Sequence, residues 1–128
     1  TANAVTSVSL DPMLLLACVD KRGSAHEQLM RAQAFTVNIL AEDQISVSQA
    51  FARSGVEDMG DVPYLTGSTG APIIVGALAW VECEIAERIP GGDHTIFMGR
   101  VVDLAVARPD ASPLLFYAGR YRRLGEEA

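Results

Sequence analysis

The sequence predicts one mainly β domain with two helices packed outside a barrel or sheet. Three observations support this: about six segments have strand patterning, two have helical spacing, and the later strands are joined as long antiparallel hairpins. The 128 residues fit a single domain. Hydrophobic residues make up 49% and charged residues 20%, with a mean hydropathy of +0.21, which excludes a disordered or coiled-coil chain.

The first strands are predicted from side-chain alternation and from apolar runs. Residues 4–9 alternate small apolar and hydroxyl side chains, as a strand with one polar face does. Residues 13–19 form a continuous apolar run, which is typical of a strand buried on both faces. Residues 35–40 combine Phe, Val and Ile with Thr and Asn, so a third strand is expected there.

Two helices are predicted in the same half of the chain. Ser24, followed three positions later by Glu27, has the spacing of a capping box, which predicts a helix from Ser24 to about Gln33. Apolar residues recur at helical spacing within residues 41–53, so a second short helix is expected there.

The second half of the chain is predicted to be a loop followed by long strands. Residues 54–71 are rich in Gly and Asp and are expected to form a long irregular loop, a kind of segment that often covers a site or an interface. A half-buried strand is expected from Ala77, a turn at residues 90–93 and a long strand over residues 94–107. Three segments then end the chain: a loop (108–113), an apolar strand (114–117) and an exposed charged tail from Gly119.

The strand from Ala77 carries two glutamates on one face. Apolar side chains at the alternate positions face the other way, so Glu82 and Glu84 are expected on a solvated surface and are assigned no role as acid and base. Trp80 lies beside them and is expected to pack or to contact a second subunit rather than to stack on a cofactor.

The charge balance restricts the possible ligands. Ten Lys and Arg against 16 Asp and Glu give a net charge of −6 and an isoelectric point of about 4.7. A nucleic-acid binder needs an excess of basic charge, so no nucleic-acid partner is expected. An anionic ligand requires a local cluster of donors, because the overall field opposes it.

The cysteines and the hydropathy pattern point to a soluble, cytoplasmic protein. Cys18 and Cys83 lie in apolar runs without CxxC spacing and no signal peptide is in view, so two buried reduced thiols are expected, although spacing alone leaves a disulfide open. The richest apolar run, residues 13–19, is far shorter than the roughly 18 residues of a spanning helix, so no membrane partner is expected.

Common catalytic and metal-binding signatures are missing from the sequence. It has no GxSxG elbow, no HExxH, no Cys/His metal cluster and no phosphate loop of the GxxxxGK[ST] type. The glycines at residues 67–70 are too close together for a dinucleotide fingerprint and precede a strand, which argues against a Rossmann fold. We therefore assign no metal ligand and no catalytic side chain.

The strongest local signal lies at residues 21–26. Lys21 and Arg22 lead through Gly23 into the predicted helix. The first N–H groups of a helix point outward and carry partial positive charge, so this end can bind a phosphate. The alternative is an ordinary capped helix with two solvated basic residues.

Two further clusters are candidates for ligand contacts. Thr6, Ser7 and Ser9, with Asn3 upstream, offer hydroxyls and backbone amides to a flat, heteroatom-rich ligand such as a flavin ring; the alternative is a solvent-facing polar stripe on an edge strand. His94 follows a Gly-Gly-Asp turn, where it can meet a negatively charged group or relay a proton; the alternative is a histidine that caps the turn.

Three segments taken together resemble the flavin reductase family, the small NAD(P)H:flavin oxidoreductases that supply reduced flavin to two-component monooxygenases. They are residues 1–12 (TANAVTSVSLDP), 35–40 (FTVNIL) and 91–101 (GGDHTIFMGRV). Shorter matches in the expected order extend the resemblance over nearly the whole chain: residues 70–72, 76–79, 82–83, 114–117 and 119–121.

The resemblance implies a fold, an activity and partners. Residues 1–128 would form a split β-barrel domain that binds FMN or FAD, usually as a homodimer with the flavin near the subunit interface. A hydride would pass from NADH or NADPH to the flavin, and a partner monooxygenase would receive the reduced flavin. Because the family usually has a helix and an opening strand before the Thr-Ala-Asn motif, and this sequence starts at that motif, we expect a domain that is short at its N-terminus.

The resemblance also assigns binding residues by position, in three sets. The flavin ring and ribityl chain would contact Asn3, Thr6, Ser7, Val8 and Ser9, with Cys18 and Val19 on the same wall. The phosphate would face Lys21, Ser24, Ala25 and His26, in agreement with the argument from the helix end. The nicotinamide would lie against Gly92, Asp93 and His94, with His94 in a positioning role and no side chain acting as acid or base in the hydride step.

Two other functions stay open at this point. One is a different flavin- or deazaflavin-dependent split-barrel oxidoreductase, similar to nitroreductases or to pyridoxamine-phosphate oxidases. The other is a non-catalytic flavin-binding module that has lost turnover.

Overall fold

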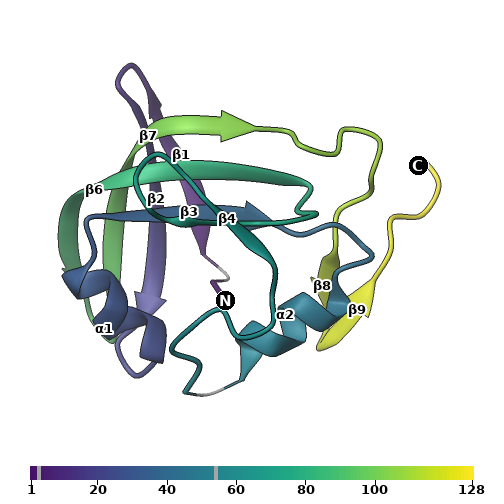
Figure 1. Cartoon of the computed structure of the whole chain (residues 1–128), viewed down its shortest axis with the longest axis horizontal. Helices are drawn as coiled ribbons and strands as arrows, with labels where there is room; N and C mark the ends of the chain where they lie inside the picture. Colours follow the sequence, from purple (N-terminus) through teal and green to yellow (C-terminus); the bar gives the residue numbers. More distant parts are fainter. Residues whose placement is uncertain (3, 54) are drawn as a thin grey trace.

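A five-stranded antiparallel sheet organises the chain, in the spatial order β1-β2-β7-β6-β3 (Figure 1). The structure is a computed structural model that describes residues 1–2, 4–53 and 55–128. Both helices lie below this sheet in the view of Figure 1, and two further two-stranded sheets pair β4 with β5 and β8 with β9. The elements are β1 (Val5–Leu10), β2 (Met13–Asp20), α1 (Ser24–Arg31), β3 (Ala34–Ile39), α2 (Ile45–Ala52), β4 (Tyr64–Thr66), β5 (Pro72–Ile74), β6 (Ala79–Gly91), β7 (His94–Ala105), β8 (Leu115–Tyr117) and β9 (Arg120–Arg122).

The long β6–β7 hairpin is the centre of the sheet. Its turn lies where the sequence predicts one, at residues 90–93, and Gly92 adopts φ +69° there, a conformation that glycine reaches without a steric penalty. β6 has register shifts at residues 82–83 and 85–87. Such bulges bend and twist a strand, which lets the hairpin curve around the core.

The core lies where β2, β6 and β7 pack together. Leu15, Cys83 and Phe97 are buried, one from each of these strands. Gly99 of β7 permits the close approach: a Cβ at this position would lie 2.8 Å from the Cβ of Cys83 and 2.8 Å from the Cζ of Phe35. The absence of a side chain at Gly99 is therefore a packing requirement.

The helix predicted at Ser24 is confirmed, but its predicted capping box is wrong. α1 begins at Ser24 and ends at Arg31, yet its N-cap residue is Gly23 and no side chain caps the first turn. The Ser24 hydroxyl instead donates a hydrogen bond to the carbonyl oxygen of Val56, over 3.0 Å. The hydroxyl that was expected to cap the helix thus bonds to a residue 32 positions further along the chain.

Several strand predictions need correction. β2 is not buried on both faces: Leu15 and Ala17 are buried, whereas their neighbours along the strand are half-buried or exposed. The long loop predicted over residues 54–71 contains β4, which pairs with β5, and the charged tail contains β9. The described residues therefore form nine strands rather than about six.

The predicted exposure of Glu82 is wrong. Glu82 and its neighbour Cys83 are both fully buried, and the face of β6 that carries Glu82 is covered by the turn at Gly67, Ser68 and Thr69, which packs on its carboxylate. Glu84 is exposed, as predicted. The two glutamates therefore lie in different environments, although they are two positions apart.

The remaining expectations concern the two cysteines and a membrane-spanning segment. Cys18 and Cys83 are both free; Cys83 is buried, whereas Cys18 is half-buried. Among the described residues, neither helix has the length and apolar character needed to cross a membrane.

Candidate functional site

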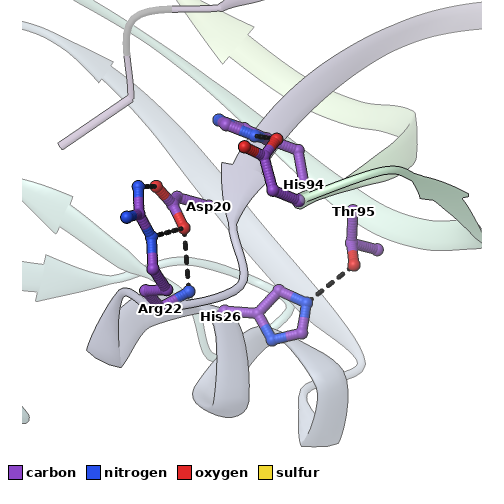
Figure 2. Close-up of polar contacts among 6 residues, drawn as sticks. Asp20, Arg22, His26, His94 and Thr95 are labelled. Carbon is purple, nitrogen blue, oxygen red and sulfur yellow. Dashed lines mark hydrogen bonds and ion pairs between the residues drawn. The ribbon is translucent and has the colours of Figure 1, made fainter.

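The turn after β2 lies against the β6–β7 turn, which brings the two polar candidate segments together. Asp20, the last residue of β2, pairs with His94, the first residue of β7. The backbone N–H of Lys21 donates to the carbonyl oxygen of Asp93 over 2.9 Å. Residues more than 70 positions apart in the sequence therefore form one surface, and Figure 2 shows its side chains.

The side chain of His26 extends from α1 to Thr95, the second residue of β7. Its Nε2 lies 2.7 Å from the hydroxyl of Thr95, which is 5% exposed, and this contact is drawn in Figure 2. The imidazole also meets the ring of Phe97 edge-on, with 6.0 Å between centroids. The ring thus packs against the sheet, and its predicted contact with a phosphate stays a prediction.

Two acidic side chains beside this contact are paired with basic groups. Arg22 donates to both carboxylate oxygens of Asp20, through Nε over 3.2 Å and Nη2 over 2.9 Å, and these hydrogen bonds hold the pKa of Asp20 well below its ordinary value. Asp93 Oδ1 lies 2.7 Å from Nδ1 of His94, and that hydrogen bond holds the pKa of Asp93 below its ordinary value. Asp93 therefore fixes the orientation of the His94 ring.

An open cavity of about 460 Å³ lies at the start of α1. Gly23, Ser24 and Ala25 line one side of it, and residues 51–53 and 56–59 contribute much of the rest. No side chain of the described residues caps α1, and the His26 N–H donates to the carbonyl oxygen of Gly23, so the N–H groups of Ser24 and Ala25 are the ones that can meet an anion in this cavity.

Residues 56–59, which line the cavity opposite the start of α1, are held to this helix by two hydrogen bonds. Ser24 Oγ donates to the carbonyl oxygen of Val56 over 3.0 Å, and Gln28 Nε2 donates to the carbonyl oxygen of Glu57 over 3.2 Å. Both bonds use backbone acceptors of the segment. The hydroxyl of Ser24 keeps its lone pairs and the backbone N–H of Ser24 is not used in these contacts.

The predicted ring-binding residues follow β1 away from this cavity. Thr6, Ser7 and Val8 are exposed, Ser9 is half-buried, and the β1–β2 register shifts around Val8. Asn3 lies outside the described residues. Thr1 lines the cavity at α1, so the β1 segment starts at the phosphate-binding candidates and extends along the edge of the sheet.

Cys18 and Val19 lie on β2, which is the strand between β1 and β7. Both are half-buried on β2, where they pair with Ile96 and Thr95 of β7, and the N–H of Cys18 donates to the carbonyl oxygen of Ala4 over 2.9 Å. The structure therefore brings every described candidate residue onto or beside the β1–β2–β7 side of the sheet.

Sequence reasoning did not select two residues that complete this surface. The β2–β7 pairing places Asp20 beside His94, and the fold brings Thr95 against His26 of α1; the sequence reveals neither. The only local signal was the position of Asp20 directly before the Lys21–His26 segment.

The fold and this surface define a small antiparallel β domain with a helix start that is open to an anionic ligand. A family model described as "Flavin reductase like domain" matches residues 1–125, and the chain belongs to this family. The family predicted from the sequence is confirmed.

Curated relatives are similar over most of the chain. An NADH-dependent FAD reductase of Streptomyces globisporus is 41% identical over 133 residues, which cover 100% of this chain and 72% of the relative. The NADH-dependent flavin reductase StyB of Pseudomonas fluorescens is 40% identical over 124 residues, covering 94% and 71%. A probable flavin reductase of Rhizobium meliloti (strain 1021) is longer: 44% identity extends over 79% of this chain but 32% of that protein.

Solved structures confirm the predicted split-barrel fold and oxidoreductase class. The NADH:FAD oxidoreductase SgcE6 of Streptomyces globisporus C-1027 matches with a TM-score of 0.90 and 40% identity, over 99% of this chain and 77% of that one. The same protein is also solved in complex with NAD and FAD fragments. The flavin reductase PheA2 matches with a TM-score of 0.85 and 36% identity, over 98% and 79%.

Proposed function

We propose that this chain is an NADH-dependent flavin reductase that binds FMN or FAD. The observation that carries the proposal is the hydrogen bond from the Lys21 N–H to the carbonyl oxygen of Asp93. It places the cavity at the start of α1, where an anion can bind, near the β6–β7 turn that carries His94. The covalent chemistry belongs to the two ligands, since a hydride passes from the nicotinamide to the flavin. The protein then has to hold both rings in contact and exclude other geometries.

The residues at the α1 cavity fit a flavin phosphate. Lys21 is exposed two positions before Gly23, which lines the cavity, and the N–H groups of Ser24 and Ala25 belong to a helix start without a side-chain cap. These local donors matter because the net charge of −6 repels an anion at long range. We assign Lys21, Ser24, Ala25 and His26 to the phosphate side of the site.

The flavin ring is proposed to lie along β1. Thr6, Ser7, Val8 and Ser9, together with Asn3, would bind the ring and the ribityl chain, and Cys18 and Val19 would line the same wall. The exposed hydroxyls and the register shift around Val8 support this, because an irregular edge strand presents backbone groups that the sheet does not use.

The nicotinamide is proposed to lie against the β6–β7 turn, at Gly92, Asp93 and His94. Nδ1 of His94 donates to the carboxylate of Asp93, so Nε2, which has no hydrogen-bond partner among the described residues, can bind the dinucleotide. Hydride transfer moves no proton at this ring, and His94 is therefore a positioning residue.

We further propose a cytoplasmic homodimer domain, residues 1–128, that passes reduced flavin to a monooxygenase. Four exposed apolar side chains on the β1–β2 hairpin, Val5, Val8, Leu10 and Met13, support a second copy at this edge. Two free thiols support a reducing compartment. Light scattering of the purified protein tests the dimer, and a monomer at micromolar concentration would reject it.

The activity is tested with purified protein, NADH and each of FMN, FAD and riboflavin. The expected result is flavin binding, seen as quenched flavin fluorescence, and flavin-dependent loss of NADH absorbance. Absence of flavin binding would reject the proposal. Bound flavin without NADH oxidation would reject the enzyme and favour a non-catalytic flavin-binding module.

A further inference from the structure

The contact between His26 and Thr95 joins the two halves of the proposed site. His26 belongs to α1, whose first turn lines the cavity, and Thr95 directly follows His94 on β7. Their side chains meet at 2.7 Å, and Thr95 is 5% exposed, so water does not compete strongly for this hydrogen bond (Figure 2).

The position of the His26 ring is set on more than one side. Its edge-on contact with Phe97, which is fully buried, limits rotation of the imidazole. Thr95 is in turn held in the middle of the sheet, where it pairs with Val19 of β2 and Pro90 of β6. A displacement of α1 is therefore transmitted to β7 through packed side chains rather than through a loop.

A second connection runs through the backbone. The Lys21 N–H donates to the carbonyl oxygen of Asp93, so the α1 entrance is tied to the residues on both sides of His94. The backbone bond holds the turn in place, whereas the His26 contact is the side-chain link between the helix itself and β7.

We propose that His26 is a positioning residue that couples flavin binding at α1 to nicotinamide binding at His94. This inference rests on the proposed function. Occupation of the α1 cavity fixes the helix, the His26–Thr95 hydrogen bond fixes the start of β7, and His94 then meets the nicotinamide in one orientation. Each ligand thereby tightens the binding of the other by the same factor, as linkage requires.

The test measures that factor with ligands that do not react together, FMN and NAD⁺. The Kd of NAD⁺ is determined with and without saturating FMN, and the Kd of FMN with and without NAD⁺, for the parent protein and for variants. Thr95→Val removes the hydroxyl at nearly constant volume. Thr95→Ser keeps the hydroxyl and is its matched control.

His26 provides a second matched pair. The amide nitrogen of Gln reaches about as far as Nε2 of His, whereas the amide of Asn reaches only as far as Nδ1. His26→Gln is therefore expected to keep the link to Thr95, and His26→Asn is expected to lose it. The Lys21–Asp93 backbone bond is present in every variant, and thermal melting checks that each variant is folded.

In the parent, FMN is expected to lower the Kd of NAD⁺ and NAD⁺ to lower the Kd of FMN equally. Thr95→Val and His26→Asn are expected to reduce that factor by about threefold to tenfold, the range of one hydrogen bond, and the double variant no further. Thr95→Ser and His26→Gln are expected to retain it. In turnover, the two link-breaking variants are expected to raise the KM for NADH more than they lower kcat.

Two results overturn the inference without touching the proposed function. One is a parent that oxidises NADH with flavin but shows no mutual tightening; the other is a tightening that Thr95→Val and His26→Asn leave unchanged. A parent that binds no flavin overturns both the proposed function and this inference. If Thr95→Val melts below the assay temperature, the comparison of His26→Gln with His26→Asn decides.

Discussion

Thr69 and Glu82 are joined by two hydrogen bonds across the gap between the β4–β5 turn and the sheet. The backbone N–H of Thr69 donates to Oε2 of Glu82 over 2.9 Å and its hydroxyl donates to the same oxygen, while Ser68 donates to Oε1 over 3.1 Å. Gly67 passes so close that a Cβ there would lie 2.1 Å from Oε2. A buried carboxylate thus anchors this turn to β6.

Glu82→Gln is expected to destabilise the fold by about 2 kcal/mol, because it replaces charge-assisted hydrogen bonds with weaker neutral ones at a fully buried position. Urea denaturation measures the change. The control is Glu84→Gln on the same strand, where an exposed ion pair with Arg100 is lost and less than about 1 kcal/mol is expected. Equal losses in the two variants would contradict the anchoring role.

Stability is expected to fall in acid. Burial acts to raise the pKa of Glu82, but the hydrogen bonds from Thr69 and Ser68 outweigh it and hold that pKa below its ordinary value; Arg22 lowers the pKa of Asp20 likewise. Since the unfolded chain then binds protons at a higher pH than the folded chain, the stabilisation is complete above about pH 5 and is lost as the pH falls through the folded pKa values.

Urea unfolding at several pH values checks this expectation. The free energy of unfolding should decrease between about pH 5 and pH 3, and the decrease should be smaller in Glu82→Gln, which has no carboxyl to protonate. A free energy that is constant across this range would show that these carboxyls titrate alike in the folded and unfolded chains.

Gly99→Ala is expected to cost about 1–3 kcal/mol, since its methyl group would overlap Cys83 and Phe35 in a packed core. Gly125→Ala is the control: no atom lies within 4 Å of a Cβ there and the residue is in the exposed tail, so a change within about 0.5 kcal/mol is expected. Thermal melting compares the two. A Gly99→Ala protein as stable as the parent would mean that the β6–β7 packing is looser than the structure shows.

Helices and strands could be predicted where a regular side-chain pattern determines the structure. Glu82 is a position where the pattern fails. Its alternation with Val81 and Cys83 predicts a surface position, but the turn at Gly67, Ser68 and Thr69 covers this face of β6 and buries the carboxylate. That turn comes from 13 to 15 positions earlier in the chain, so the local strand pattern does not encode the contact. Similarly, Ser24 has the spacing of a helix cap, but its hydroxyl donates to the carbonyl oxygen of Val56, 32 positions away.

The candidate site was predictable in its composition and not in its connections. Lys21 and the helix start follow from local sequence, and His94 follows from the turn before it. The hydrogen bond between His26 and Thr95 spans 69 positions and depends on the β2–β7 register. Only the folded sheet brings such residues together, because side-chain types alone do not specify which strands are neighbours.

His94→Ala is expected to raise the KM for NADH about tenfold or more, a loss of about 1.4 kcal/mol, while the Kd of FMN changes less than about twofold. The reason is that His94 is proposed to meet the nicotinamide, whereas the phosphate is proposed to meet Lys21 and the first turn of α1. Steady-state kinetics with varied NADH and a fluorescence titration with FMN separate the two effects. Unchanged kinetics would remove His94 from the site.

Lys21→Ala is expected to weaken FMN binding about tenfold and riboflavin binding hardly at all, because the two flavins differ only in the phosphate that Lys21 is proposed to face. The loss should shrink as salt is added, since Lys21 is exposed and its charge is screened. Arg31→Ala is the matched control, an exposed cation at the opposite end of α1 that is paired with Glu27 over 2.7 Å, and it should leave both flavins unaffected. Fluorescence titrations at low and high salt measure the affinity of each flavin for the parent and for both variants. An equal loss for FMN and riboflavin in Lys21→Ala would place Lys21 against the ring or in the fold, and would move the phosphate away from the start of α1.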